Sequence, residues 1–382
     1  MTKPEEENSK SEIRMTNQIQ NSKDETIAIS NFGHSNLIRH SNFEFRISPS
    51  RRWDARRLLL TILLCAAAVA VAGFLAISVG SNGAGWPAAA IRRFRAESVI
   101  NAALIGAALA GAGVAYQAIL RNPLADPYLL GVSSGASLMA YLWQLPLFAA
   151  IVKGLGILAP LSQQTASFVG ALAAVSIVLG LAGRRGRLEP VTLLLVGVIV
   201  NAVNGSLFML VNALVEQLPG NGGPMGFLVG GIQAITSQQR WAALSLIVVG
   251  WVVLMYFSGQ LNVAALDDGE AESMGVRIHR LRWIALVAAS LMTAAAVAIS
   301  GPIGFVGLVC PHVGRLLVGS DQRRLLPVST AIGAILLMAA DALCRYLSGE
   351  RLLANLLPVG VLTGLLGGPV FLWLLFRTRR SG

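Results

Sequence analysis

Apolar and polar positions alternate on a long period from residue 58 onward, where apolar runs of about 20 residues are separated by short polar breaks. A helix needs about 20 apolar residues to cross the hydrocarbon core of a bilayer. The pattern therefore predicts an all-α polytopic membrane protein with ten transmembrane helices, at 58–80, 96–120, 128–148, 163–183, 191–214, 240–258, 282–301, 303–319, 327–347 and 357–376. Segment 224–236 is apolar but too short to span, which indicates a re-entrant or interfacial segment.

The eighth predicted span is the most irregular. In and around it lie Pro302, Pro311, His312 and four glycines, Gly301, Gly304, Gly307 and Gly314. Proline removes a helical hydrogen bond and glycine weakens a helix, so we expect a broken helix here.

The first 57 residues follow a different pattern. They hold 18 of the 49 charged residues, ten basic and eight acidic, and they show no apolar period. Chains of this composition cannot bury enough apolar surface to fold. The sequence therefore predicts two regions, a disordered cytoplasmic tail at 1–57 and a ten-helix transmembrane domain at 58–382.

Composition supports this division. The whole chain is 54% hydrophobic and 13% charged, against about 25% charged in ordinary soluble proteins. Its three cysteines exclude a secreted disulfide scaffold. The net charge of +11 could indicate a nucleic-acid binder, but the basic residues follow the loops. If both termini lie in the cytoplasm, 17 of the basic residues from Arg51 onward lie on the inner side and seven on the outer side. The positive-inside rule favours this orientation. It also accounts for most of the net charge without binding to nucleic acid.

Three of the outer basic residues, Arg92, Arg93 and Arg95, cluster just before the second span. They could anchor the helix at the lipid headgroups, where long basic side chains extend toward water. They could also form a docking patch for an acidic extracytoplasmic partner.

The fifth span carries polar residues along one helical face, at Asn201, Asn204 and Asn212, with Phe208 between them. Amides in hydrocarbon need hydrogen-bond partners or a polar cavity. Interhelical hydrogen bonding and a pore-lining stripe are equally compatible with this pattern.

Two further features concern packing and ion coupling. Asp341 lies within the ninth span four residues before Arg345, so we expect the two to pair; a paired acid gives little support to coupling by protons or sodium. In the second span, small residues recur every four positions and predict tight helix packing, at Ala103, Ala107, Gly111 and Ala115.

The longest inner loop, 259–281, is charged and predicts a short helix over Ala264–Met274, ended by Gly275. It could contact a cytoplasmic partner or serve as a solvated connector.

Residues for enzyme chemistry are few, and we expect no catalytic residue, metal or cofactor. The histidines and cysteines are scattered, at His34, His40, His279, His312, Cys65, Cys310 and Cys344. A phosphate-binding loop needs glycine before its lysine, whereas the one lysine beyond residue 57, Lys153, follows valine. If ATP drives this protein, another chain must bind it.

Two long stretches are the most distinctive, RNPLADPYLLGVSSG at 121–135 and GPIGFVGLVCPHVGR at 301–315. Others are RRFR at 92–95, LLLVGVIVNA at 193–202, the loop 264–282 and PVGVLTGLLGGPV at 358–370. Over about residues 85–377 the chain resembles the FecCD-type permease subunits of ABC importers for iron-siderophores, haem and cobalamin.

The resemblance implies a type II ABC importer permease fold in the cytoplasmic (inner) membrane, surrounded by lipid. It implies a pair of permeases with two ABC ATPase subunits beneath and a substrate-binding protein above. We expect the pair to be a homodimer, and a paralogous second permease is the alternative. It also implies residue roles: binding-protein docking by Arg92, Arg95 and Arg345; a cytoplasmic gate at Asn122, Pro123 and Leu124; a translocation path along Asn201, Asn204, Phe208 and Asn212; and ATPase coupling at Ala271 and Gly275.

The sequence departs from the family pattern in places. Arg93-Phe94 stands where the first arginine pair usually encloses Leu-Pro, and Glu97 follows within reach of Arg93. The coupling loop carries DDGEAES in place of a GEETARS-like run, and Leu356-Leu357 replaces Glu-Leu.

We therefore expect a permease subunit that moves a ferric chelate by alternating access and performs no covalent chemistry. Cobalamin and haem are the alternative substrates, because their importers share these motifs. An ion-coupled secondary transporter is the alternative from another class.

Overall fold

The computed structural model describes residues 55–80, 83–145, 163–183, 189–215, 230–232, 235–266, 268–349 and 358–380. Nearly all of the predicted tail, 1–57, lies outside these residues, as do Lys153, 224–229 and Leu356-Leu357. Apart from the end of the last helix, the described residues belong to one compact unit, Ile47–Arg377.

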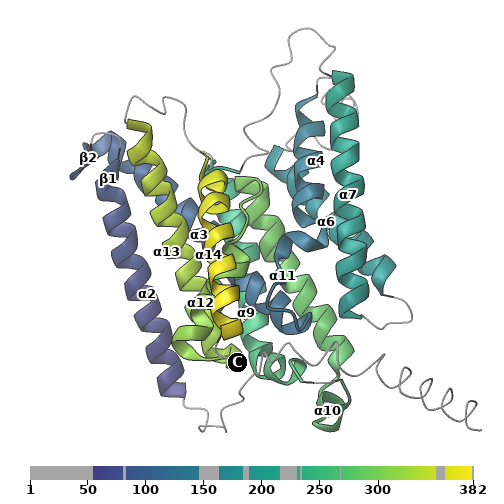
Figure 1. Cartoon of the computed structure of the whole chain (residues 1–382). Coiled ribbons are helices and arrows are strands. Elements are labelled where there is room, and N and C mark those ends of the chain that lie inside the picture. Colours follow the sequence, from purple (N-terminus) through teal and green to yellow (C-terminus); the bar gives the residue numbers. More distant parts are fainter. Residues whose placement is uncertain are drawn as a thin grey trace, which may run out of the picture. The chain divides into compact units, whose positions relative to one another are not determined.

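The described elements are almost all helices (Figure 1). In chain order they are α2 (Ala55–Ser78), β1 (Val79–Gly80), β2 (Gly83–Ala84), α3 (Ala89–Ile119), η1 (Pro127–Leu130), α4 (Val132–Gln144), α6 (Gln163–Ala182), α7 (Pro190–Val215), α9 (Ser237–Ala264), α10 (Asp268–Ser273), α11 (Ile278–Ser300), α12 (Val306–Val318), α13 (Gln322–Gly349) and α14 (Val359–Arg380).

Each of the ten predicted spans contains a described helix. Within the described ranges, seven helices are long and apolar enough to cross a membrane, namely α2, α3, α6, α7, α9, α11 and α13. Helices α4, α12 and α14 occupy the other three predicted positions. The chain is a multi-pass helical membrane protein. Among the described elements, the short antiparallel pair β1–β2 departs from the all-α prediction.

The helix expected to be broken in the eighth predicted span is continuous, because α12 runs from Val306 to Val318. The irregular backbone lies before it. Residues 301–305 separate α11 from α12, and Gly301 and Phe305 both have φ angles of 69°. Pro311 lies inside α12 without ending it. The interruption therefore follows the glycines rather than this proline.

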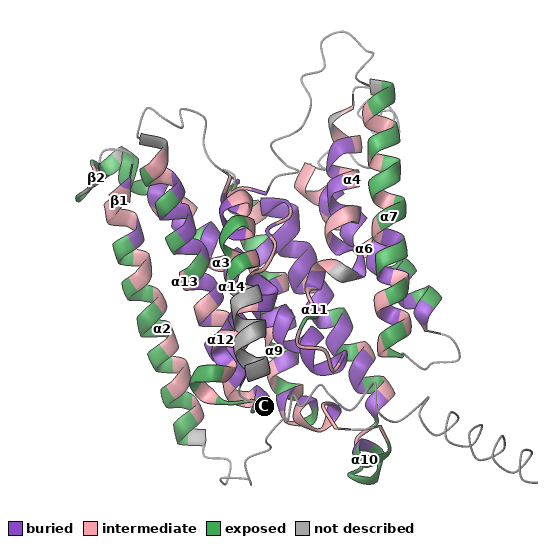
Figure 2. Cartoon of the chain, in the orientation of Figure 1, coloured by how far each residue is buried: buried purple, intermediate pink, exposed green. Residues whose placement is uncertain are grey.

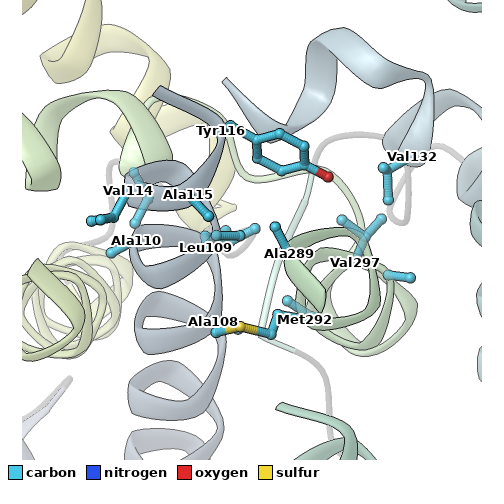
Figure 3. Close-up of a cluster of buried hydrophobic side chains, with 14 of the residues drawn as sticks. Ala108, Leu109, Ala110, Val114, Ala115, Tyr116, Val132, Ala289, Met292 and Val297 are labelled. Atoms are coloured by element: carbon cyan, nitrogen blue, oxygen red, sulfur yellow. The ribbon is translucent and has the colours of Figure 1, made fainter. Parts of the chain in front are cut away.

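Helix α3 is central to the packing and contacts α13, α11, α12 and α9. Gly106 faces the backbone of Gly333 in α13, and Gly113 faces that of Gly307 in α12, so closely that neither site has room for a Cβ. Tyr116 reaches toward α11, where its hydroxyl lies 2.7 Å from Ser290 Oγ (Figure 3). Small residues therefore let α3 pack tightly, but the closest backbone approaches fall at Gly106 and Gly113 and not at the predicted positions. Of the predicted residues, Gly111 and Ala115 are buried, whereas Ala103 and Ala107 are half-buried.

A second group consists of α4, α6 and α7, which contact one another. Gly135 of α4 and Gly170 of α6 face each other's carbonyl oxygens without room for a Cβ. In contrast to α11, α7 is exposed over most of its length (Figure 2). Its exposed large apolar residues are Val191, Leu195, Val198, Ile199, Val203, Leu207, Met209, Leu210 and Leu214.

Helix α10 is the short helix predicted in the long loop, but it covers less of it. The predicted helix began at Ala264, which is the last residue of α9, whereas α10 begins at Asp268. In Figure 1 it lies at the end of the bundle opposite the β1–β2 pair. Within segment 224–236, Gly230 and Gly231 run beside α11 and α14, because Gly231 N–H donates to Ser300 O and Gly230 O accepts from Gly360 N–H.

Candidate functional site

The turn after α3 is closed by its own hydrogen bonds. The N–H of Leu124 donates to Asn122 Oδ1 (2.9 Å), and the N–H of Ala125 donates to the Asn122 carbonyl (3.0 Å). Pro123 takes the second position of this four-residue turn, where its fixed φ is favourable. The three predicted gate residues thus form one compact turn in which Leu124 is 41% exposed.

Arg121 connects α3 to this turn with a φ of 48°, in the left-handed region that residues with a Cβ seldom adopt. Its Nε donates to the carbonyl of Ala264, the last residue of α9, at 3.0 Å, and its Nη2 donates to Asp268 Oδ1. A cation is favourable at the carboxyl end of a helix because the last carbonyls carry partial negative charge. Arg121 therefore contacts both the end of α9 and the start of α10.

Asp268 is shared between two arginines. Arg282 of α11 donates from Nη1 to Oδ2 at 3.0 Å and from Nη2 to Oδ1 at 2.6 Å. Burial disfavours the ionised carboxylate, but the hydrogen bonds and positive charge of Arg282 and Arg121 outweigh it and hold the pKa of Asp268 below its ordinary value. Asp268 is therefore a carboxylate at neutral pH.

The predicted coupling residues lie on and just after α10. Ala271 is the buried residue of that helix, and its carbonyl accepts from the N–H of Val276 at 3.1 Å. Gly275 has a φ of 79° and open space around it, so its backbone angle rather than crowding favours glycine. These two residues shape the return of the chain from α10 to α11.

The two stretches that carry the resemblance, 121–135 and 301–315, pack against each other. Gly307 has no room for a Cβ because Pro127 lies beside it. The Tyr128 hydroxyl donates to Ile303 O and accepts from Ile303 N, both at 2.8 Å. Gln117 of α3 donates to Gly307 O at 3.3 Å. These contacts fix the approach to α4 against the break before α12.

The polar stripe of α7 faces α4 and η1. Asn201 donates to Tyr128 O (2.9 Å) and accepts from Ser134 Oγ (2.7 Å). Asn204 donates to the same Ser134 hydroxyl at 3.1 Å.

The rest of the stripe continues this contact. Asn212 accepts from the Tyr141 hydroxyl at 3.0 Å, and the Phe208 ring lies 4.7 Å from the Tyr141 ring. The four predicted path residues therefore share one helical face, and within this chain the amides are hydrogen-bonded between helices.

The three predicted docking arginines differ in their surroundings. Arg92 is exposed, and its guanidinium lies 5.8 Å from the centre of the Trp86 ring. Arg95 is buried and donates to Ile77 O at 3.2 Å. Arg345 donates to Ala76 O at 3.0 Å. Arg95 and Arg345 thus both bind the last turn of α2, while Arg92 does not.

Ion pairs around these arginines match two expectations. Arg345 and Asp341 pair at 3.0 Å, and Asp341 also accepts from Ser98 Oγ at 3.1 Å. Arg93 pairs with Glu97 at 3.5 Å. Both pairs were expected from the spacing of the residues.

Sequence reasoning missed the arginine–aspartate cluster at α10 and the Tyr128 contact with Ile303. Arg121 and Arg282 counted only as inner charges, and Asp268 only as part of an acidic run.

Within the described part of the chain, no group of three or more His, Cys, Asp or Glu side chains is placed to hold a metal ion.

Comparisons with known proteins cover most of the chain. The model of the FecCD transport family matches residues 57–377. The cobalamin import system permease protein BtuC of Halobacterium salinarum is 37% identical over 324 residues, which cover 78% of this chain and 82% of that protein. The hemin transport system permease protein HmuU of Yersinia pestis is 38% identical over 296 residues, covering 75% and 84%. A solved chain from an ABC transporter in an inward-facing conformation matches with a TM-score of 0.69 and 25% identity, over 84% of this chain and 99% of that one.

Proposed function

The chain belongs to the FecCD transport family, and we propose that it is the permease subunit of an ABC importer that carries a ferric chelate. The observation that carries this proposal is the family match over residues 57–377, which takes in nearly every described helix. Relatives named for cobalamin and for hemin place the chain among importers of this group of substrates. The ferric chelate is the narrower part of the proposal.

The proposed assembly contains two copies of this chain, two ABC ATPase subunits and an extracytoplasmic substrate-binding protein. The sequence has no phosphate-binding loop, so ATP would be bound by the ATPase subunits.

The proposed orientation places α10 and both termini on the cytoplasmic side. Basic residues counted on the inner side lie at the α10 end, since Arg121 and Arg282 bind Asp268 and Arg323 lies beside Gly259 of α9. The positive-inside rule favours this arrangement in the inner membrane.

In the proposed mechanism, the loaded binding protein docks outside and ATP draws the ATPase subunits together. That closure displaces α10, where Ala271 and Gly275 set the shape of the contact. The turn Asn122–Leu124 then opens as the inner gate. The permease itself supplies two alternating conformations and no covalent chemistry.

The proposed path runs along α7, where Asn201, Asn204, Phe208 and Asn212 share one face. Their bonds to α4 and η1 support a specific role for the path residues, which is to hold α4 and α7 together as one wall. The polarity of the stripe then stabilises the wall and exposes few free amides to the cargo.

Docking of the binding protein is proposed to begin at Arg92, because its exposed guanidinium is open to a partner carboxylate. Arg95 and Arg345 would join only if they exchanged the carbonyls of α2 for that partner. Glu97 lies beside Arg93 and Arg240 and lowers the net positive charge nearby.

A substrate experiment tests the narrower proposal. The binding protein of the same transport system would be purified and offered a ferric siderophore, haem and cobalamin, and the retained ligand would then be supplied to vesicles holding the complete importer. We expect retention and ATP-dependent uptake of the ferric siderophore. Retention and uptake of cobalamin or haem instead would contradict the ferric chelate while leaving the importer class intact.

A further inference from the structure

We propose that the Arg121–Asp268 ion pair is the link through which movement of α10 reaches the turn Asn122–Ala125. This proposal rests on the proposed function, because it concerns how ATPase motion would be transmitted. It assigns a positioning role to three residues that the sequence did not single out, Arg121, Asp268 and Arg282.

Arg121 and the turn are continuous in the chain. Arg121 directly precedes Asn122, and the turn that follows is closed by two hydrogen bonds to Asn122. A displacement of the Arg121 guanidinium is therefore passed to a compact unit rather than absorbed by a loose segment.

Arg121 bridges the bend between α9 and α10. The Arg121 guanidinium contacts Ala264 O on one side of the bend between α9 and α10, and Asp268 on the other side. When α10 tilts relative to α9, these two contacts cannot both keep their geometry. Arg121 must follow one of them, and the charged partner Asp268 makes the stronger hydrogen bond.

The three charged residues differ in how deeply they are buried. Arg282 has a side-chain exposure of 2% and belongs to α11, which is buried along most of its length, so it is a fixed point. Asp268 is 42% exposed on a helix of six residues, and Arg121 is 25% exposed. The Asp268 carboxylate can therefore rotate about its contact with the immobile Arg282 and displace the more accessible Arg121.

A purely static role would have different consequences. If the cluster only attached α10 to the bundle, the Arg282–Asp268 pair would suffice, because it makes two hydrogen bonds of its own. Removing Arg121 would then leave transport unchanged. The two roles therefore separate on the variant Arg121→Gln, which keeps the Arg282 contact.

The experiment compares Arg121→Gln, Asp268→Asn, the double variant and Glu272→Gln in complexes reconstituted with ATPase subunits and binding protein. Glu272 is exposed on the same helix and serves as the matched acidic control. We expect Arg121→Gln to assemble and to hydrolyse ATP, with uptake per ATP reduced about tenfold, a coupling effect in the usual range. The double variant should lose no more than Asp268→Asn alone, since both substitutions break one link. Glu272→Gln should behave as wild type.

Spin labels make the test independent of uptake. Cysteines would be placed at the exposed positions 124 and 272 of separate chains in which Cys65, Cys310 and Cys344 are replaced, and the distance between the two copies of the label would be measured with and without ATP. We expect ATP to shift both positions in the wild type but only position 272 when Arg121→Gln is added.

Wild-type uptake per ATP in Arg121→Gln, or an unchanged ATP-driven shift at position 124, would overturn the link. Losses that multiply in the double variant would overturn it as well. If the unsubstituted complex itself shows no ATP-dependent uptake, the proposed function fails, and the link falls with it.

Discussion

Two arginine–aspartate clusters lie at opposite ends of the bundle and use the same chemistry differently. The Asp341 cluster consists of Asp341, Arg345, Ser98 and Arg95, and its two arginines bind the last turn of α2. The Asp268 cluster consists of Asp268, Arg121 and Arg282, and Arg121 binds the last residue of α9. In both clusters, arginine satisfies helix-terminal carbonyls while pairing with one aspartate.

The difference lies in what the aspartate is attached to. Asp341 is buried within α13, a helix of 28 residues that packs along α3 and α2. Asp268 begins a helix of six residues and is 42% exposed. The Asp341 cluster therefore holds long helices together, whereas the Asp268 cluster leaves α10 able to move relative to α9 and α11.

The largest expected effect is on the Asp341 cluster. Asp341→Asn leaves Arg345 without its carboxylate in a buried setting, and breaking a buried pair in this way destabilises proteins by about 3–5 kcal/mol. The lost stability would appear as a lower denaturant midpoint when the purified permease is unfolded in detergent. Glu97→Gln, at the more exposed pair with Arg93, is the control and should change the stability by less than about 1 kcal/mol. Equal denaturation midpoints for Asp341→Asn and Glu97→Gln would show that the buried ion pair contributes no more stability than the exposed one.

The next effect concerns the exit from α10. Gly275→Val places a β-branched residue at a φ of 79°, which disfavours the native turn by about 1–2 kcal/mol. We expect ATP hydrolysis to persist while uptake falls, measured together in reconstituted vesicles. The matched control is Gly269→Val, because Gly269 also has open space around it but no positive φ.

A larger side chain at Ala271 tests the buried side of α10. Ala271 is fully buried, and overpacking a buried site costs about 1–3 kcal/mol. Ala271→Leu should therefore also uncouple ATP hydrolysis from uptake. Normal coupling in both Gly275→Val and Ala271→Leu would remove α10 from the mechanism.

A smaller effect separates docking from fastening at the outer cluster. Arg92→Glu reverses an exposed charge, so we expect slower association of the binding protein with unchanged stability of the permease. Arg95→Glu should also destabilise α2, because it removes the bond to Ile77 O. Association kinetics and denaturant midpoints together distinguish the two. If Arg92→Glu leaves association unchanged, docking does not begin there.

The helices could be predicted from the sequence because each span is a continuous run of about 20 apolar residues. All ten predicted spans contain a helix. The break expected within the eighth span was wrong, because α12 is continuous and the irregular backbone precedes it at residues 301–305. Gly275 marked the end of the short helix α10, since a helix end needs a residue that tolerates positive φ.

The clusters themselves could not be predicted. Arg121 and Asp268 are 147 residues apart, and Tyr128 and Ile303 are 175 apart, so only packing brings them together. Arg95 and Arg345 bind main-chain carbonyls, which every residue possesses and no motif identifies. The Asp341–Arg345 pair was predictable because its partners are one helical turn apart.

The central claim is that ATP, bound by partner subunits, drives transport through this chain. The most direct test is uptake of the labelled ferric chelate into vesicles, comparing the complete complex supplied with ATP against the permease alone under a proton or sodium gradient. We expect uptake only with the ATPase subunits, ATP and the loaded binding protein. Accumulation by the permease alone under an ion gradient would contradict it and would favour a secondary transporter.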